Sequence, residues 1–275
     1  MEPMDDIYAE IARLRAAGQN AALATIIQVR GSIPSFETAK FLVREDGSTL
    51  GTIGGGCVEA EVWQAAREVM REEKSRRLVF HLNQDAKEEN GLICGGTLEI
   101  FVEPVLAQPI VWLIGAGHVA RAIAQVAETA GFATAVADDR EAFASRERFP
   151  HARELHVGDL DQVLPRLRIG ASAYIAIVTR GHKGDMRALA WAVTTPARYI
   201  GMIGSRRKVI ESYKELRRQG VAAAALERVH APIGLDIGAI TPEEIGVAVV
   251  AEMIAARRGA AAGAPSLALG AAALR

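Results

Sequence analysis

The spacing of apolar residues changes several times along the first part of the chain. Apolar residues recur every three or four positions over 5–17 and 58–72, which predicts two amphipathic helices. Short apolar or alternating runs bounded by turn residues predict strands. These predicted strands cover 21–29, 40–44, 49–53, 76–81 and 97–105. Residues 1–105 are therefore expected to form a small α+β domain.

A different pattern begins at Ile110, where short apolar strands alternate with helical segments. The predicted strands are 110–114, 134–137, 154–157, 173–178 and 199–203. The predicted helices are 121–130, 160–167, 186–193, a helix that follows the turn 204–208 and ends at Arg218, and a helix that opens at 241–244. Such alternation is typical of a parallel sheet with helices on both faces. The fold class is thus α/β: the α+β domain is followed by a Rossmann-like doubly wound parallel-sheet domain over 109–258. An Ala/Gly-rich tail follows over 259–275.

Three consecutive glycines mark a predicted strand-to-helix junction in the first domain. Gly54, Gly55 and Gly56 end an apolar run, and Cys57 follows them where the helical pattern begins. Glycine permits positive φ and close backbone approach, and a helix start offers unpaired N–H groups that suit an anion. A thiol at such a position is expected to have thiolate character and to react or to ligate. A buried structural cysteine beside a tight turn explains the pattern equally well. Cys94 also lies beside paired glycines.

The second domain opens with the arrangement of a dinucleotide fold. A strand meets Gly115-Ala-Gly117-His-Val-Ala120, a helix follows, and the next strand ends at Asp138. In such folds the glycines let a phosphate approach the helix start, and the acid accepts hydrogen bonds from ribose hydroxyls. The alternatives are a tight turn without a ligand and a solvated strand end.

Further polar residues follow the later strands of this domain. Ser205, Arg206 and Arg207 begin a helix, where arginine suits bidentate contacts to phosphate; a charged, solvated first turn is the alternative. His182 is a candidate for proton transfer or an ordinary surface histidine. Loops after the carboxyl ends of parallel strands line one crevice, so four loops are expected to converge. These are 115–120, 138–140, 179–185 and 204–208. No motif identifies a catalytic residue.

Composition and charge narrow the classes of partner. The chain has 32 Lys and Arg against 33 Asp and Glu, a net charge of -1, which gives no support for a nucleic-acid partner. Two cysteines far apart do not form a disulfide framework, and the six histidines lack zinc-site spacing. No apolar run resembles a signal peptide or a membrane span. A cytoplasmic protein is therefore expected.

Several ordered motifs resemble those of the xanthine dehydrogenase accessory family, XdhC/CoxI, over nearly the whole chain. They are Gly31-Ser-Ile-Pro34, Gly51-Thr-Ile-Gly-Gly-Gly-Cys57-Val-Glu59, Cys94-Gly-Gly96, Gly115-Ala-Gly117-His-Val119, Thr179-Arg-Gly-His182, Tyr199-Ile-Gly-Met-Ile-Gly-Ser-Arg-Arg207 and Pro232-Ile-Gly-Leu-Asp-Ile-Gly238.

This resemblance implies a function that composition does not. Family members are described as chaperones, not enzymes, that bind molybdenum cofactor (molybdopterin), protect it during sulfuration and deliver it to a molybdenum hydroxylase of the xanthine dehydrogenase type. A cysteine desulfurase is a further implied partner. Thiolate can ligate molybdenum, and the pterin phosphate needs an anion site. The implied cofactor-binding residues are Gly54, Gly55, Gly56, Cys57, Cys94, Gly115, Gly117, Asp138, Ser205, Arg206 and Arg207, with Cys57 as a contact to molybdenum.

Other interpretations of the sequence stay open. The Rossmann-like domain alone would suit an NAD(P)-dependent oxidoreductase, and NAD(P) or another nucleotide is a second candidate ligand. A protein-interaction module with vestigial sites is a third interpretation. The soft thiol of one domain and the anion-binding turns of the other are expected to share one ligand. The sequence also allows a homodimer.

Overall fold

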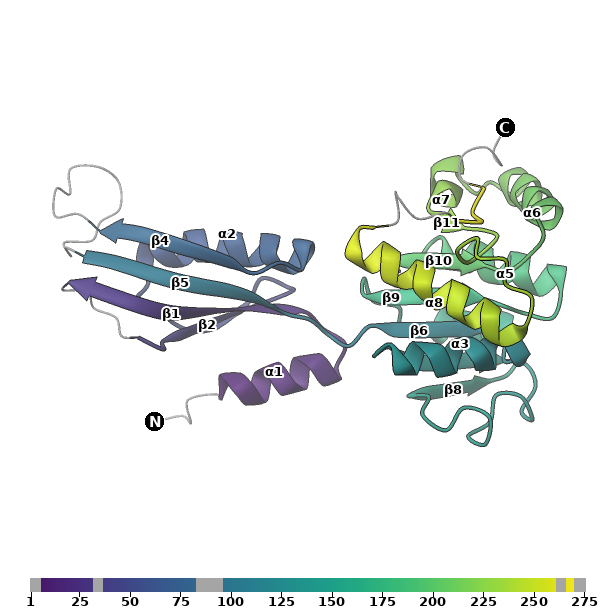
Figure 1. Ribbon diagram of the computed structural model, residues 1–275, viewed down its shortest axis with the longest axis horizontal. Helices are drawn as coiled ribbons and strands as arrows, with labels where there is room; N and C mark the ends of the chain where they lie inside the picture. Colours follow the sequence, from purple (N-terminus) through teal and green to yellow (C-terminus); the bar gives the residue numbers. More distant parts are fainter. Residues whose placement is uncertain (1–5, 32–36, 83–95, 261–265, 270–275) are drawn as a thin grey trace. The chain divides into compact units, whose positions relative to one another are not determined.

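The computed structural model of the chain describes residues 6–31, 37–82, 96–260 and 266–269. The chain divides into two compact units (Figure 1), unit 1 over Met1–Gln108 and unit 2 over Pro109–Arg275. The fold class predicted from the sequence is confirmed: unit 1 contains an antiparallel sheet with helices, and unit 2 contains a parallel sheet. Within the described residues, no helix is both long and apolar enough to cross a membrane.

Unit 1 is built on a five-stranded antiparallel sheet in the order β3-β2-β1-β5-β4. Its strands are β1 (Ala21–Gly31), β2 (Lys40–Arg44), β3 (Thr49–Gly51), β4 (Arg76–Leu82) and β5 (Gly96–Val105). Its helices are α1 (Ile7–Ala16) and α2 (Gly56–Glu72). Successive strand residues point to opposite sides of the sheet, so both of its faces can bury apolar side chains.

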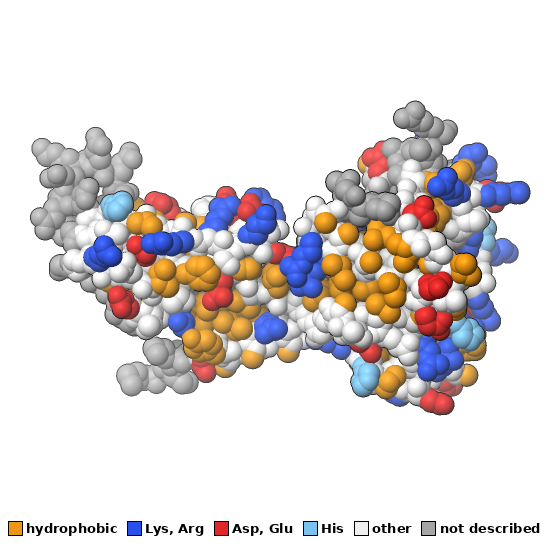
Figure 2. Space-filling view, in the orientation of Figure 1, with side chains coloured by type: hydrophobic (Ala, Val, Ile, Leu, Met, Phe, Trp, Pro, Cys, Tyr) orange, Lys and Arg blue, Asp and Glu red, His pale blue; other side chains and the backbone are white. Residues whose placement is uncertain are grey.

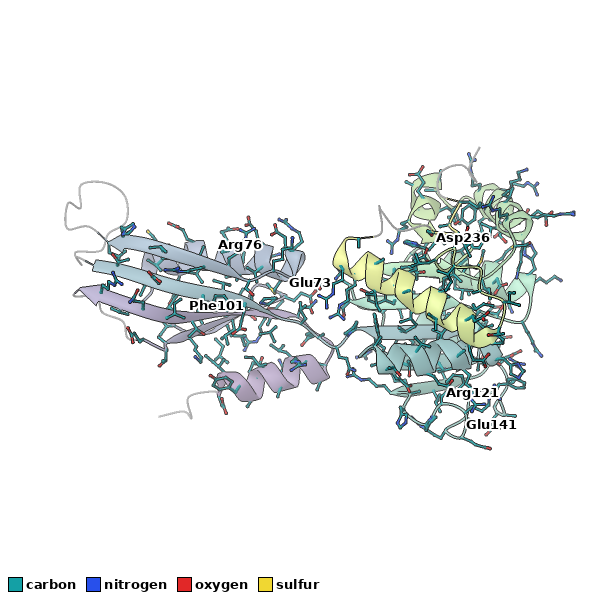
Figure 3. All side chains as sticks on the ribbon, viewed as in Figure 1. Glu73, Arg76, Phe101, Arg121, Glu141 and Asp236 are labelled. Carbon is teal, nitrogen blue, oxygen red and sulfur yellow. The ribbon has the colours of Figure 1, made fainter. Side chains whose placement is uncertain are left out.

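Alternate residues of β1 belong to two different cores. Ala22 and Ala24 pack with the α2 residue Val62, whereas Leu23 packs with Leu14 of α1. Ion pairs at the edge of the sheet also fasten α2, since Arg76 of β4 contacts Glu68 and Glu72 of that helix. Figure 3 labels Arg76. These contacts hold the last turns of α2 against the edge of the sheet.

Unit 2 contains a six-stranded parallel sheet in the order β11-β10-β9-β6-β7-β8. The strands are β6 (Ile110–Ile114), β7 (Ala133–Asp138), β8 (Glu154–Val157), β9 (Ala173–Ile177), β10 (Tyr199–Met202) and β11 (Val229–His230). The helices are α3 (His118–Thr129), α4 (Leu160–Val163), α5 (His182–Ala192), α6 (Arg206–Arg218), α7 (Ala223–Glu227) and α8 (Pro242–Arg258), and a 3-10 turn covers Leu164–Arg166. The chain order reverses direction across the sheet between β6 and β9, which is where ligands bind in folds of this type.

Helices cover both faces of this sheet. Trp112 and Ile114 of β6 pack into one core with α5 and α6, whereas Val111 and Leu113 pack into the other with α3 and α8. Figure 1 shows α3 and α8 side by side on their face. Gly246 of α8 allows this close approach, because a Cβ at that position would lie only 2.9 Å from the carbonyl carbon of Ala122.

The structure differs from the predicted elements at several places, and it adds helix α7, which the sequence did not predict. Helix α5 begins at His182 instead of Met186, because its first turn is polar and carries no apolar periodicity. The two-residue strand β11, Val229–His230, was not predicted either. The segment 83–95, with a predicted polar loop and Cys94, lies outside the described residues.

One glycine brings the carboxyl ends of β6 and β9 together. A Cβ at Gly115, whose φ is +108°, would lie 2.5 Å from the carbonyl oxygen of Val178. We expect Gly115→Ala to lower the free energy of unfolding by at least about 2 kcal/mol, because it adds both a clash and backbone strain. Gly117→Ala is the matched control: its φ is -69° and a Cβ there meets nothing within 4 Å, so the loss should stay below about 1 kcal/mol. Equal losses in urea unfolding would contradict the close approach.

Candidate functional site

The glycine loop of unit 1 has a backbone that other residues rarely adopt. Gly54, Gly55 and Gly56 all have positive φ, at 117°, 78° and 67°. A Cβ built on Gly55 or Gly56 would meet no atom within 4 Å, so the surface beside the loop is open. The glycines are therefore required by the conformation, and not by crowding from the protein itself. Cys57 follows them in the first turn of α2 and is half-buried.

A carboxylate of the chain itself occupies part of this loop. Oε1 of Glu59 accepts hydrogen bonds from the amides of Ile53 and Gly55, at 3.1 and 3.0 Å, and from the hydroxyl of Thr52 at 2.6 Å. One amide at the helix start, that of the N-cap Gly55, and one amide of the preceding loop, that of Ile53, are thus already paired. In the sequence, Glu59 could have been recognised as an acidic residue in the first turn of a helix that follows a glycine loop.

Besides the helix start, the loop carries a soft donor that suits a soft metal. It presents a thiol beside open space, and thiolate sulfur is a donor that molybdenum accepts. The residues present fit a metal-bearing cofactor at this point by donor chemistry and by space. In the described part of the chain, no group of three or more His, Cys, Asp or Glu side chains is placed to hold a metal ion.

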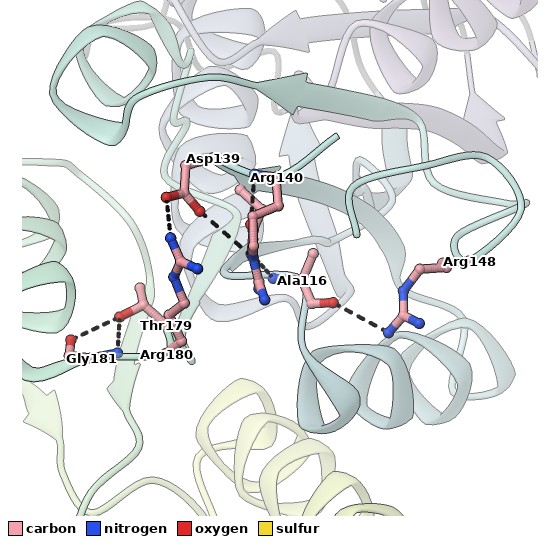
Figure 4. Close-up of polar contacts among 8 residues, drawn as sticks. Ala116, Asp139, Arg140, Arg148, Thr179, Arg180 and Gly181 are labelled. Atoms are coloured by element: carbon pink, nitrogen blue, oxygen red, sulfur yellow. Dashed lines mark hydrogen bonds and ion pairs between the residues drawn. The ribbon is translucent and has the colours of Figure 1, made fainter. Parts of the chain in front are cut away.

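The four loops of unit 2 meet as the sequence predicts. The 115–120 loop contacts the 138–140 loop through a hydrogen bond from the Ala116 amide to Asp138 at 2.7 Å. Arg180 pairs with Asp139 at 2.7 Å (Figure 4), which joins the loop after β9 to the loop after β7. Lys208 contacts Asp185 at 2.5 Å and so brings in the start of α6. A single polar edge results.

Asp138 is a structural carboxylate at this edge. Its side chain is 4% exposed, and its oxygens accept hydrogen bonds from Ala116 and from the amide, Nε and Nη2 of Arg140, at 2.7 to 2.9 Å. Burial raises the pKa of Asp138, but the Arg140 side chain and the two amides outweigh it and lower the pKa from 3.8 to about 2. A ribose contact at Asp138 would have to share these oxygens with Arg140, which the sequence did not single out.

A pocket of about 380 Å³ lies beside this carboxylate. Acidic residues Asp139 and Asp159 line it, together with Arg180, His182 and Lys183 from the start of α5. Gly115 lines it as well, whereas Gly117 does not. The start of α5 supplies helix N–H groups and cations, and the aspartates supply acceptors for hydroxyl or amine groups.

A buried ion pair fixes the start of α5. Asp185 is fully buried and accepts hydrogen bonds from the hydroxyl and amide of Thr179, at 2.6 and 3.2 Å, and from Lys208. The side chain of Lys208 is therefore held by a buried carboxylate of the chain itself. His182 lies in the pocket, with Nδ1 3.5 Å from Ser212 Oγ.

The predicted anion turn at the start of α6 is exposed. The hydroxyl of Ser205 accepts the Lys208 amide at 3.3 Å and caps the helix, and Arg207 pairs with Glu211 at 3.0 Å. Ser205, Arg206 and Arg207 lie outside the pocket lining. Their contact with a ligand stays a prediction.

Comparisons with known proteins agree with this architecture. Residues 111–253 match the XdhC Rossmann domain, and residues 14–81 match the XdhC and CoxI family. The class defined by the fold is thus a small α+β unit joined to a Rossmann unit. The chain belongs to the XdhC and CoxI family, as its motifs suggested.

Individual relatives extend this result. The chain is 37% identical over 259 residues to "Uncharacterized protein YqeB" of Escherichia coli, a match that covers 94% of this chain and 47% of YqeB, so it spans about half the length of that relative. It is 23% identical to a Bacillus subtilis protein described as a probable subunit of xanthine dehydrogenase, over 87% of this chain and 94% of that protein. A stretch of 64 residues is 36% identical to "Molybdenum cofactor insertion chaperone PaoD" of Escherichia coli, and this match covers 23% of this chain and 20% of PaoD.

A solved structure shows the same fold. A crystal structure described as a xanthine dehydrogenase from Bacillus halodurans matches with a TM-score of 0.51 and 23% identity, over 91% of this chain and 95% of that one. At this identity the likeness speaks for the fold alone.

The structural role of Asp138 can be tested by pH-dependent stability. A carboxyl whose pKa falls from 3.8 to about 2 on folding stabilises the protein above pH 4, and this stability is lost as the pH falls toward 2. Asp138→Asn should therefore lower the free energy of unfolding by about 2 kcal/mol at pH 6. The difference from the parent chain should shrink below pH 4, as measured by urea unfolding.

Asp139→Asn is the matched control. This neighbour is 45% exposed and pairs with Arg180, also exposed, so its loss should cost no more than about 1 kcal/mol. Equal losses for the two variants at pH 6 would show that Asp138 does not hold the edge of the sheet.

Proposed function

We propose that this chain is an accessory protein for a molybdenum hydroxylase of the xanthine dehydrogenase type. It binds molybdenum cofactor, protects it while the terminal sulfur is installed, and passes it to the client enzyme. A cysteine desulfurase is the class of protein that would supply that sulfur, and the cytoplasm is the expected compartment. Membership of the XdhC and CoxI family supports this proposal, as does the likeness of one segment to an insertion chaperone.

The observation that carries the proposal is the placement of Cys57. This residue follows three glycines with positive φ, and a Cβ built on Gly55 or Gly56 would meet no atom within 4 Å. Glu59 already accepts hydrogen bonds from two amides of the loop, and thiolate sulfur is the donor of this loop that a soft metal prefers. In the cargo, molybdenum provides the soft acceptor, and Cys57 would hold it by its sulfur.

The pocket of unit 2 is the second half of the proposal. Arg180 and Lys183, together with the N–H groups at the start of α5, would bind a phosphate group, and Gly115 would allow close approach. Gly117, Asp138, Ser205, Arg206 and Arg207 are kept as candidate contacts. Cys94 is kept as a second candidate thiol in unit 1.

Nicotinamide chemistry is the competing proposal for this pocket. Rossmann topology favours it. Both oxygens of Asp138 are engaged by Arg140 and Ala116, however, so the usual ribose contact is not ready-made. We therefore propose the pterin, and not a nucleotide, as the ligand of this pocket. The proposed role does not require catalytic turnover.

The test is retention of molybdenum cofactor by Cys57 variants. Parent chain and variants are mixed with cofactor released from a molybdenum hydroxylase, separated by gel filtration, and assayed for oxidised, fluorescent pterin. Cys57→Ala should bind at least about tenfold more weakly, and Cys57→Ser nearly as weakly, because a hydroxyl does not replace a soft thiolate.

Two controls make the result specific. Glu61→Gln changes an exposed residue of the same helix and should leave retention unchanged. Cys94→Ser tests the second thiol on its own. Full retention by both Cys57 variants, with unchanged circular dichroism, would contradict the assignment.

A further inference from the structure

The outer face of α8 is an exposed apolar stripe with opposite charges at its two ends. Val247 and Ile254 are 49% and 40% exposed, and Ala251 lies between them. Glu243 and Arg258 continue the same face, because all five positions are three or four residues apart. Figure 2 shows hydrophobic side chains gathered over this helix.

The opposite face of α8 is already fixed within unit 2. Gly246 packs directly on Ala122 of α3. Glu252 is buried and accepts hydrogen bonds from the Tyr199 hydroxyl at 2.5 Å and from the Gly234 amide at 2.9 Å. The helix is therefore held rigidly, and its outer stripe is preorganised for a partner.

We propose that this stripe binds a second copy of the chain, with the two α8 helices antiparallel across a twofold axis. The residue numbers support this symmetry: 243 and 258, and also 247 and 254, share one midpoint between 250 and 251. Val247 then faces Ile254 of the partner subunit, and Glu243 faces Arg258 of the partner subunit. The small side chain of Ala251 lies beside the axis, where the helices come closest.

Charge complementarity selects a second copy over other occupants. A twofold interface must match its own surface, and a helix with acid at one end and base at the other does so only when antiparallel. Within the described residues, neither Glu243 nor Arg258 has an ion pair of its own. One helix face is small for an interface, so the dimer is expected to be reversible. This inference is independent of the bound cofactor.

Reversal of the end charges tests the register. Sedimentation velocity of the full chain, over roughly a hundredfold range of concentration, should show a mass that rises from one chain to two. Glu243→Arg and Arg258→Glu should each weaken dimerisation at least about tenfold, because like charges then face each other. The double variant should return to within about threefold of the parent chain.

The rescue cannot come from helix stability. Each single change places the wrong charge at an end of the helix dipole, and the double variant carries both defects. Val247→Glu should abolish the dimer, whereas the control Val157→Glu, at a 47% exposed position on β8, should not. A monomer at every concentration, a dimer that tolerates Val247→Glu, or a double variant no better than the singles would each overturn the proposal.

Discussion

The carboxylate of Asp138 is the contact on which the polar edge of unit 2 depends. It is buried at the end of β7, and it holds both the Ala116 amide and the Arg140 side chain. The loop after β6 is thereby fixed while Gly115 packs against the carbonyl of Val178. A rigid rim of this kind gives the adjoining pocket its shape, and the acid that would face a ribose in a dinucleotide fold is engaged by its own loop.

Unit 1 uses an internal carboxylate in a comparable way. Glu59 binds amides of the glycine loop, as Asp138 binds the amide of Ala116. In both units a carboxylate of the chain neutralises part of the positive potential that a glycine loop and a helix start create. What each loop offers to a ligand is therefore set by other groups: the Cys57 thiol in unit 1, and the start of α5 with Lys183 in unit 2.

The elements that apolar spacing defines were predictable from the sequence, and long-range polar contacts were not. Strand 110–114 and the cap of α8 at Thr241 follow from local pattern and turn chemistry. Arg140 pairs with Asp138 two positions away, whereas Lys208 is taken by a carboxylate that the fold brings near. Lys208 and Asp185 are 23 positions apart, and nothing local to either residue signals that pairing. The sequence singles out Cys57 because it follows three glycines, and its role as a ligand stays a prediction.

Binding of molybdenum cofactor by this chain is tested most directly by the small molecules that accompany it from cells. The chain would be purified from cells that make the cofactor, then analysed for metal by mass spectrometry, for pterin by fluorescence after oxidation, and for nicotinamide nucleotides by chromatography. Molybdenum and pterin in equal amounts, in proportion to protein, are the predicted result. Stoichiometric NAD(H) or NADP(H) without pterin would contradict the proposed function and would favour an oxidoreductase.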